Sequence, residues 1–182
     1  MPVISQTSIQ PGTSQSGLGD ITQSFFFSPR KPGAGGLIWG VGPVLFLPTG
    51  TDPALSARKW AAGPMAVLLK QDGPWTVGML ANHIWAGGGD SNRPNVSNTF
   101  IQPFLSYTTK DAWTYGINTE STYEWNTRQW SVPVNMTVTQ LLKVGGQALT
   151  LQAGARYWAD TPDTTGPKGW GIRLTVNLLF PK

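Results

Sequence analysis

Four charged residues in the C-terminal half are spaced so that they would share one face of a β-sheet. Glu120 and Glu124 alternate with aromatic residues in segment 112–125, and Arg156 and Arg173 alternate with mostly apolar residues in the last two segments. Successive side chains of a strand point to opposite faces, so this spacing separates the charges from the apolar positions. Such charges either select solutes as a constriction or neutralise one another in a ladder of ion pairs, and the sequence leaves both interpretations open.

Uncharged polar residues share the face of these four charges. Asn118, Gln152 and Asn177 have the same parity and complete a predicted polar lining of an interior. The opposite face of the last strand is apolar, with Trp170, Ile172, Leu174, Val176, Leu178 and Phe180 in alternation. A strand of this kind separates an apolar surface from a polar one.

Few residues could support catalysis or hold a metal ion. The sequence has one histidine, His83, no cysteine and no Gly-x-Ser-x-Gly motif, and its His, Asp and Glu residues lack metal-ligand spacing. His83 has the parity of Trp75 and Trp85, so we expect a hydrogen-bonded histidine at the rim rather than a catalytic base. We therefore expect no enzymatic activity, no cofactor and no metal.

The composition differs from that of ordinary soluble domains. Charged residues are 12% of the sequence, about half of the usual ~25%. Nine tryptophans are present, yet the mean hydropathy is only −0.15 and no apolar run approaches the ~18 residues of a transmembrane helix. The 13 basic residues are scattered, which argues against nucleic-acid binding. This combination is typical of a barrel with an apolar outer face and a polar, mostly uncharged interior.

Gly, Pro, Asn and Asp clusters divide the chain into strand-like segments, and no helical apolar stripe is present. Ten strands are predicted, at 1–9, 19–29, 36–47, 58–70, 75–86, 95–109, 112–125, 128–142, 147–159 and 168–180. Short turns at 30–35, 71–74, 110–111 and 143–146 alternate with longer polar loops at 10–18, 48–57, 87–94 and 160–167, and the short connection at 126–127 is the exception. Glycines inside the strands predict local bending, at Gly40, Gly42, Gly63, Gly78, Gly116 and Gly154.

Tryptophans mark both ends of the predicted strands. Trp75 and Trp85 share a face, and the ten residues from one to the other, at ~3.4 Å each with a tilt of about 40°, rise roughly 26 Å. This rise matches the apolar band of about 25 Å on an outer-membrane barrel. Because indole favours the headgroup level, eight tryptophans are predicted at the membrane interfaces: Trp39, Trp75 and Trp113 at the turn end, and Trp60, Trp85, Trp125, Trp130 and Trp170 at the loop end. The chain is therefore predicted to be an all-β, antiparallel, up-and-down transmembrane β-barrel that contacts outer-membrane lipid.

Seven short motifs, in order over nearly the whole chain, resemble one family of bacterial outer-membrane barrels. They are Ser-Pro-Arg-Lys (28–31), Pro-Thr-Gly-Thr (48–51), Gly-Pro (63–64), Asn-His-Ile-Trp (82–85), Phe-Ile-Gln-Pro-Phe-Leu-Ser-Tyr (100–107), Trp-Ser-Val-Pro (130–133) and Phe-Pro-Lys (180–182). Members are labelled as transporters, are grouped with proteins of the meta-pathway of phenol degradation and are often mislabelled neuromedin U. The resemblance implies a transport barrel of about twelve strands, of which about ten are present here.

The two ends of the chain carry further expectations. The N-terminus lacks the basic and apolar regions of a signal peptide, so residues 1–182 are expected to be a single domain, the C-terminal portion of a longer barrel in the bacterial outer membrane. The last strand closes on Phe180, and bacterial barrels typically end on such an aromatic, which the barrel assembly machinery recognises.

Three functions of different classes remain open. The leading one is a channel that passes small solutes, hydrophobic or aromatic ones among them, through a polar lumen. The second is a non-conducting structural or surface-binding barrel that acts through loops 48–57, 87–94 and 160–167. The third and least favoured is a soluble β-barrel that binds an apolar ligand, in which the Trp-rich face would turn inward.

Overall fold

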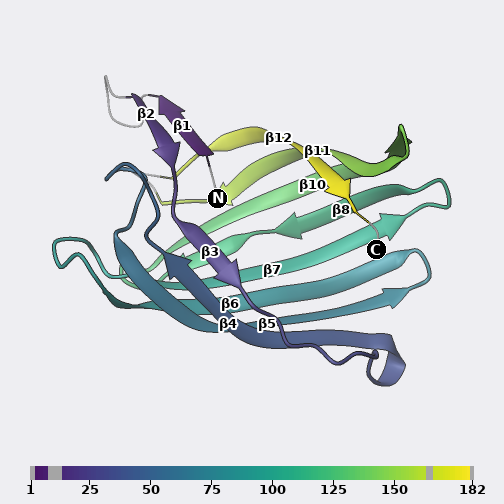
Figure 1. Cartoon of the computed structure of the whole chain (residues 1–182), viewed down its shortest axis with the longest axis horizontal. Coiled ribbons are helices and arrows are strands. Elements are labelled where there is room, and N and C mark those ends of the chain that lie inside the picture. The colour runs from purple at the N-terminus through teal and green to yellow at the C-terminus, as the bar shows by residue number, and fades with distance from the viewer. Residues whose placement is uncertain (1–2, 8–13, 163–165, 181–182) are drawn as a thin grey trace.

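The structure is a computed structural model that describes residues 3–7, 14–162 and 166–180. It is all-β (Figure 1), and in this described part no helix is long and apolar enough to cross a membrane. The elements, in chain order, are β1 (Val3–Thr7), β2 (Ser14–Leu18), β3 (Ile21–Ser24), the 3-10 turn η1 (Ala34–Gly36), β4 (Leu37–Leu47), β5 (Lys59–Asp72), β6 (Trp75–Gly89), β7 (Ser97–Thr108), β8 (Trp113–Thr119), β9 (Ser121–Glu124), β10 (Gln129–Val144), β11 (Gln147–Asp160) and β12 (Gly169–Leu179).

One antiparallel sheet of ten strands makes up most of the chain. Its order is β12-β11-β10-β8-β7-β6-β5-β4-β3, and β9 continues the line of β8 between β7 and β10. Neighbours in the chain are neighbours in the sheet, which is an up-and-down arrangement. The predicted all-β, antiparallel, up-and-down class with about ten strands is therefore confirmed.

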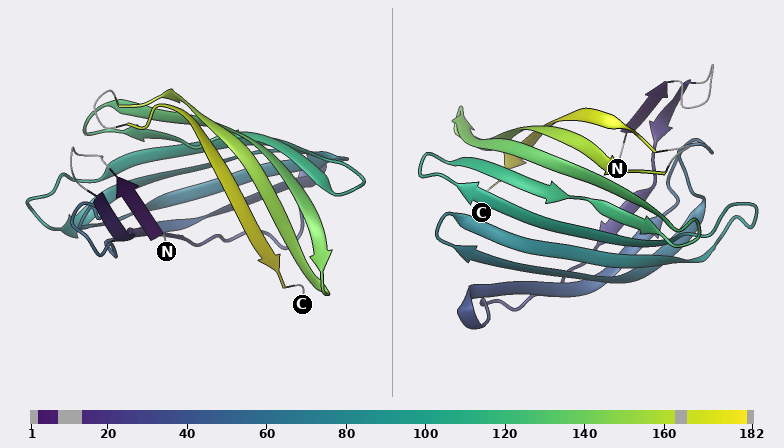
Figure 2. Two further views of the ribbon diagram at one scale, coloured as in Figure 1. Left: turned by 90° about the horizontal axis from the view of Figure 1, so that it is seen from above. Right: turned by 180° about the vertical axis from the view of Figure 1, so that it is seen from behind.

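The sheet coils into a barrel-like shape. Seen from above, β11 and β12 run at a steep angle to β5 and β6 (Figure 2), as the right-handed twist of successive strands requires. The ring closes only in part, because among the described residues no ladder joins β3 to β12. We call the concave side the inner face and the convex side the outer face.

The connections lie at two ends of the sheet (Figure 1). At one end, the turn end, lie the tight turns 73–74, 109–112 and 145–146, together with η1. At the other end, the loop end, lie connections 48–58, 90–96 and 125–128, and residues 161–162 and 166–168 of the connection between β11 and β12. The predicted alternation of short turns and longer loops is confirmed for β4 to β12, with 125–128 as the expected short exception.

Three details near the N-terminus and at β6 differ from prediction. Residues 14–18, predicted within a loop, form β2, which pairs with β1 in a separate hairpin because local pairing overrides their turn-like composition. The predicted strand 19–29 shrinks to β3 plus one bridge between Phe27 and Val41, because Phe25 donates to the Pro43 carbonyl oxygen and proline has no N–H to return the second ladder bond. β6 extends to Gly89, into the predicted loop 87–94. Predicted positions 1–2, 8–13, 163–165 and 181–182 lie outside the described residues.

The two faces of the sheet differ in their side chains. A small apolar core lies on the inner face of β4 to β6, formed by Val44, Ala61, Met65 and Ile84. Large apolar side chains of the outer face are exposed, up to 88% for Ile172 and 78% for Leu174. The inner face of β8 to β12 is instead polar, and the site described next lies there.

Candidate functional site

Glu120 lies on the inner face at a break in the sheet. Its backbone N–H donates to the Pro133 carbonyl oxygen (3.3 Å). Two residues that face each other in this way on antiparallel strands normally exchange two N–H···O hydrogen bonds. Pro133 has no N–H, so it cannot donate the second bond to the Glu120 carbonyl oxygen. The strand is therefore interrupted at Glu120, with β8 ending at Thr119 and β9 beginning at Ser121.

Two arginines reach Glu120 from the neighbouring strands. Arg156 of β11 lies opposite Gly171, and Arg173 of β12 lies opposite Gly154. Each long side chain thus faces a residue without a side chain, which leaves room on the inner face of the sheet. At Gly171 an added Cβ would come within 3.1 Å of the Trp158 ring, so the absence of a side chain there leaves space for the ring.

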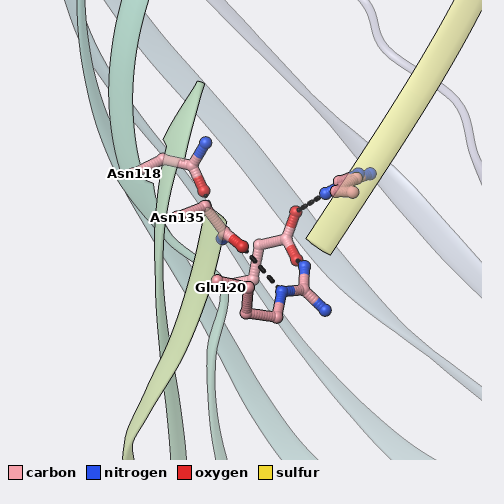
Figure 3. Close-up of polar contacts among 5 residues, drawn as sticks. Asn118, Glu120 and Asn135 are labelled. Atoms are coloured by element: carbon pink, nitrogen blue, oxygen red, sulfur yellow. Dashed lines mark hydrogen bonds and ion pairs between the residues drawn. The ribbon is translucent and has the colours of Figure 1, made fainter. Parts of the chain in front are cut away.

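These groups form one hydrogen-bonded network (Figure 3). Arg156 Nη2 pairs with Glu120 Oε2, and Arg173 Nη1 donates to Glu120 Oε1 at 2.9 Å. Arg156 Nε donates to Asn135 Oδ1 at 2.6 Å, and Asn135 Nδ2 donates to Asn118 Oδ1 at 2.8 Å. Both carboxylate oxygens of Glu120 therefore accept from a guanidinium group, and the bonds are of the strong, charge-assisted kind.

A recess of about 360 Å³ lies beside the network. It is lined by Glu120, Arg156, Trp158, Gly171, Ile172 and Arg173, and we call it the guanidinium recess. Arg156 Cζ lies 5.6 Å from the centroid of the Trp158 ring, a cation–π distance. The side chains of Glu120 and Arg156 are about a quarter exposed and that of Arg173 about half, so water and small molecules reach the charges.

The structure brings together four of the seven predicted lining residues: Asn118, Glu120, Arg156 and Arg173. The other three lie on the inner face but outside the network. Glu124 accepts from Asn126 at the loop end, Gln152 donates to Thr139 and Asn177 donates to Thr150. Glu124 is separated from Glu120 because β9 runs on from Ser121 to Glu124 toward the loop end, and each residue of a strand adds about 3.3 Å.

Two residues of the site were not singled out from the sequence. Asn135 is 2% exposed and joins Asn118 to Arg156, and Trp158 forms a wall of the recess. Both have the inner-face parity in their strands, so alternation placed them correctly. Only the register between β8, β10 and β11 identifies them as partners of Arg156.

The eight tryptophans that the sequence predicts at the turn end and the loop end are all exposed, by 40–67%. Trp39, Trp75 and Trp113 lie at the turn end and the other five at the loop end, as their positions in β4 to β12 require. A soluble barrel binding an apolar ligand inside would turn these rings inward, and their exposure counts against that arrangement. Phe180 follows β12 and is 74% exposed.

His83 lies on the outer face near the loop end. Its Nδ1 is 2.8 Å from Thr99 Oγ1, and the same hydroxyl oxygen accepts from Trp125 Nε1 at 2.8 Å. The histidine ring also stands 5.3 Å from the Trp85 ring. The predicted hydrogen-bonded rim histidine is confirmed. Among the residues that the structure describes, no three His, Asp or Glu side chains are grouped as metal ligands.

Comparison with known proteins identifies no relative: no protein-family model matches the chain, and no curated protein or solved structure is significantly similar to it. The function must therefore be inferred from the geometry of the chain.

Proposed function

We propose that this chain forms a bacterial outer-membrane β-barrel that passes small solutes past the charged network of Glu120, Arg156 and Arg173. The observation that carries the proposal is the difference between the two faces of the coiled sheet: this network lies on the inner face, and the outer face is apolar. The resemblance of the short motifs to an outer-membrane transport family agrees with it.

The outer face supports a lipid environment. Between Trp75 and Trp85 the outward positions of β6 include Val77 and Met79, which are 52% and 47% exposed. On β12 the exposed fractions of Leu174 and Val176 are 78% and 63%. A soluble monomer rarely exposes an apolar surface of this extent, because contact with water costs about 25 cal/mol per Å². Lipid as the partner of this face, and assembly machinery as the partner of the Phe180 end, are parts of the proposal.

The network supports selection by charge. Two guanidinium groups and one carboxylate leave one net positive charge, and these side chains are only partly exposed. A charge near a constriction of low dielectric attracts counterions and repels like ions. The expected preference is therefore for anions or for neutral solutes over cations.

The second candidate is a non-conducting barrel that acts at its loop end. The buried core of Val44, Met65 and Ile84 occupies the inner face beside β4 to β6. Loop 48–57 is also held in place, since Asp20 accepts from the backbone N–H groups of Gly50 (2.9 Å) and Ala57 (2.7 Å). A filled interior with a fixed loop favours a structural or surface-binding role.

Single-channel recording of the full chain in planar bilayers separates the two candidates. Under a salt gradient we expect discrete conductance with anion preference, because of the net positive network. Arg173→Ala should shift the reversal potential toward cations and Glu120→Ala toward anions. Arg30→Ala, an exposed arginine at the turn end, is the matched control and should change nothing. Absence of conductance in the wild type and in all variants would exclude the channel and favour the second candidate.

A further inference from the structure

The charges of the guanidinium recess do not balance. Glu120 is paired with both Arg156 and Arg173, and no second carboxylate pairs with either arginine in the described part of the chain. Arg58 pairs with Asp90 far along the loop end, and Glu124 is engaged with Asn126. One positive charge therefore stays without a protein counter-charge in a recess that is only partly open to water.

The arginines also keep unused hydrogen-bond donors. A guanidinium group has five N–H donors in a planar fork. Arg156 uses Nε for Asn135 and Nη2 for Glu120, and Arg173 uses Nη1 for Glu120. Within residues 3–7, 14–162 and 166–180, no protein acceptor is recorded for Nε and Nη2 of Arg173 or for Nη1 of Arg156. These donors lie on the side chains that line the recess.

The recess also offers an apolar wall. The Trp158 ring lines it and lies against Gly171, where no side chain is present to displace the ring. Its volume of about 360 Å³ is at the small end of ligand pockets, which run from ≈ 300 to 1,000 Å³. An apolar wall beside free guanidinium donors is complementary to a small molecule with one anionic end and one apolar end.

We propose that the guanidinium recess binds a small organic monocarboxylate, with its carboxylate on Arg173 and its apolar part against Trp158. Both arginines already bind a carboxylate here, that of Glu120, and the planar fork of a guanidinium group matches the two oxygens of a carboxylate. Glu120 then acts as an internal competitor that keeps binding weak enough for release. The inference rests on the proposed function, because the recess would be the selective step of passage.

The test is direct binding to the full chain in detergent micelles, measured by isothermal titration calorimetry. The probes are benzoate, its neutral analogue benzamide, and acetate, which lacks the apolar part. Benzoate should bind more tightly than acetate, and benzamide should not bind. Arg173→Ala should weaken benzoate binding about tenfold or more, since a tenfold change corresponds to ~1.4 kcal/mol. Because Arg173 is half exposed, this variant should keep the fold, which circular dichroism checks.

Three further variants test the roles within the recess. Trp158→Leu should lower the affinity for benzoate and leave that for acetate unchanged. Glu120→Gln should raise the affinity for benzoate severalfold, because it removes the competing carboxylate, and a purely structural ion pair predicts no such gain. Arg30→Ala controls for loss of an exposed arginine and should bind as the wild type does.

Equal binding of benzamide and benzoate, or unchanged binding by Arg173→Ala, would overturn the proposal. Equal displacement of benzoate by inorganic phosphate would also overturn it, because the site would then recognise only negative charge. Failure of the channel is a separate result: a chain that binds benzoate and never conducts refutes transport alone. A chain that conducts and does not bind benzoate refutes the recess alone.

Discussion

At the scale of single residues, Asn135 determines how Arg156 is held. Asn135 is 2% exposed, and both polar atoms of its amide are hydrogen-bonded: Nδ2 donates to Asn118 and Oδ1 accepts from Arg156 Nε. Buried polar groups need such partners, because an unpaired one keeps the full cost of leaving water. Leu could make neither bond, and Asp has no N–H to donate to Asn118 Oδ1. Asn135 is thus a positioning residue for the guanidinium group that faces Glu120 and Trp158.

We expect Asn135→Leu to destabilise the folded barrel by about 1–3 kcal/mol, because it leaves Asn118 and Arg156 Nε without their buried partner. Urea unfolding followed by tryptophan fluorescence measures the change. Asn177→Leu is the control: it removes one bond, to Thr150, at an exposed position, and should cost less than half as much. Equal losses in the two variants would show that Asn135 has no special role.

At the scale of elements, the sequence predicts strands well wherever apolar and polar residues alternate. The predicted segments for β4 to β12 agree with the structure to within a few residues, and so do the faces of Glu120, Arg156 and Arg173. Alternation cannot show which inner residues meet, because this depends on the register between strands. The break at Pro133 and the contact of Asn135 with Arg156 follow from that register. The prediction for Ser14–Leu18 was wrong because this polar segment does not alternate, and the prediction for Phe25 to Phe27 was wrong because it depends on Pro43 of the neighbouring strand.

Strand curvature also depends on particular residues, and Gly63 of β5 is the clearest case. An added Cβ there would overlap the carbonyl oxygen of His83 on β6, and no ladder partner on β6 is recorded for Gly63 or Pro64. Gly63→Ala should therefore push β5 from β6 and cost about 1–3 kcal/mol or more. The control is Gly87→Ala on β6, where an added Cβ meets nothing within 4 Å. Heat-modifiability on gels measures both, and equally stable variants would contradict the close approach.

At the scale of the whole molecule, the two faces of the sheet demand different surroundings. The inner face buries Val44 and Asn135 almost completely, whereas the outer face of β12 leaves Ile172 exposed by 88%. In water this distribution would favour aggregation, because the exposed apolar side chains are contiguous along β12. In lipid it is stable, provided that tryptophans occupy the headgroup level and charges stay inside.

The surroundings of the outer face can be tested by placing one charge on it. Met79 lies on β6 between Trp75 and Trp85 and is 47% exposed. An arginine at an exposed position of a soluble protein changes stability by at most about 0.5 kcal/mol. At the midplane of a bilayer it costs about 2–4 kcal/mol, and only about 0–1 near the interface.

For the full chain refolded into phospholipid vesicles, Met79→Arg should therefore lower the urea midpoint strongly. Val144→Arg, at an exposed site of the turn end, should lower it little. Equal, small effects of the two arginines would place the outer face in water and refute the membrane proposal.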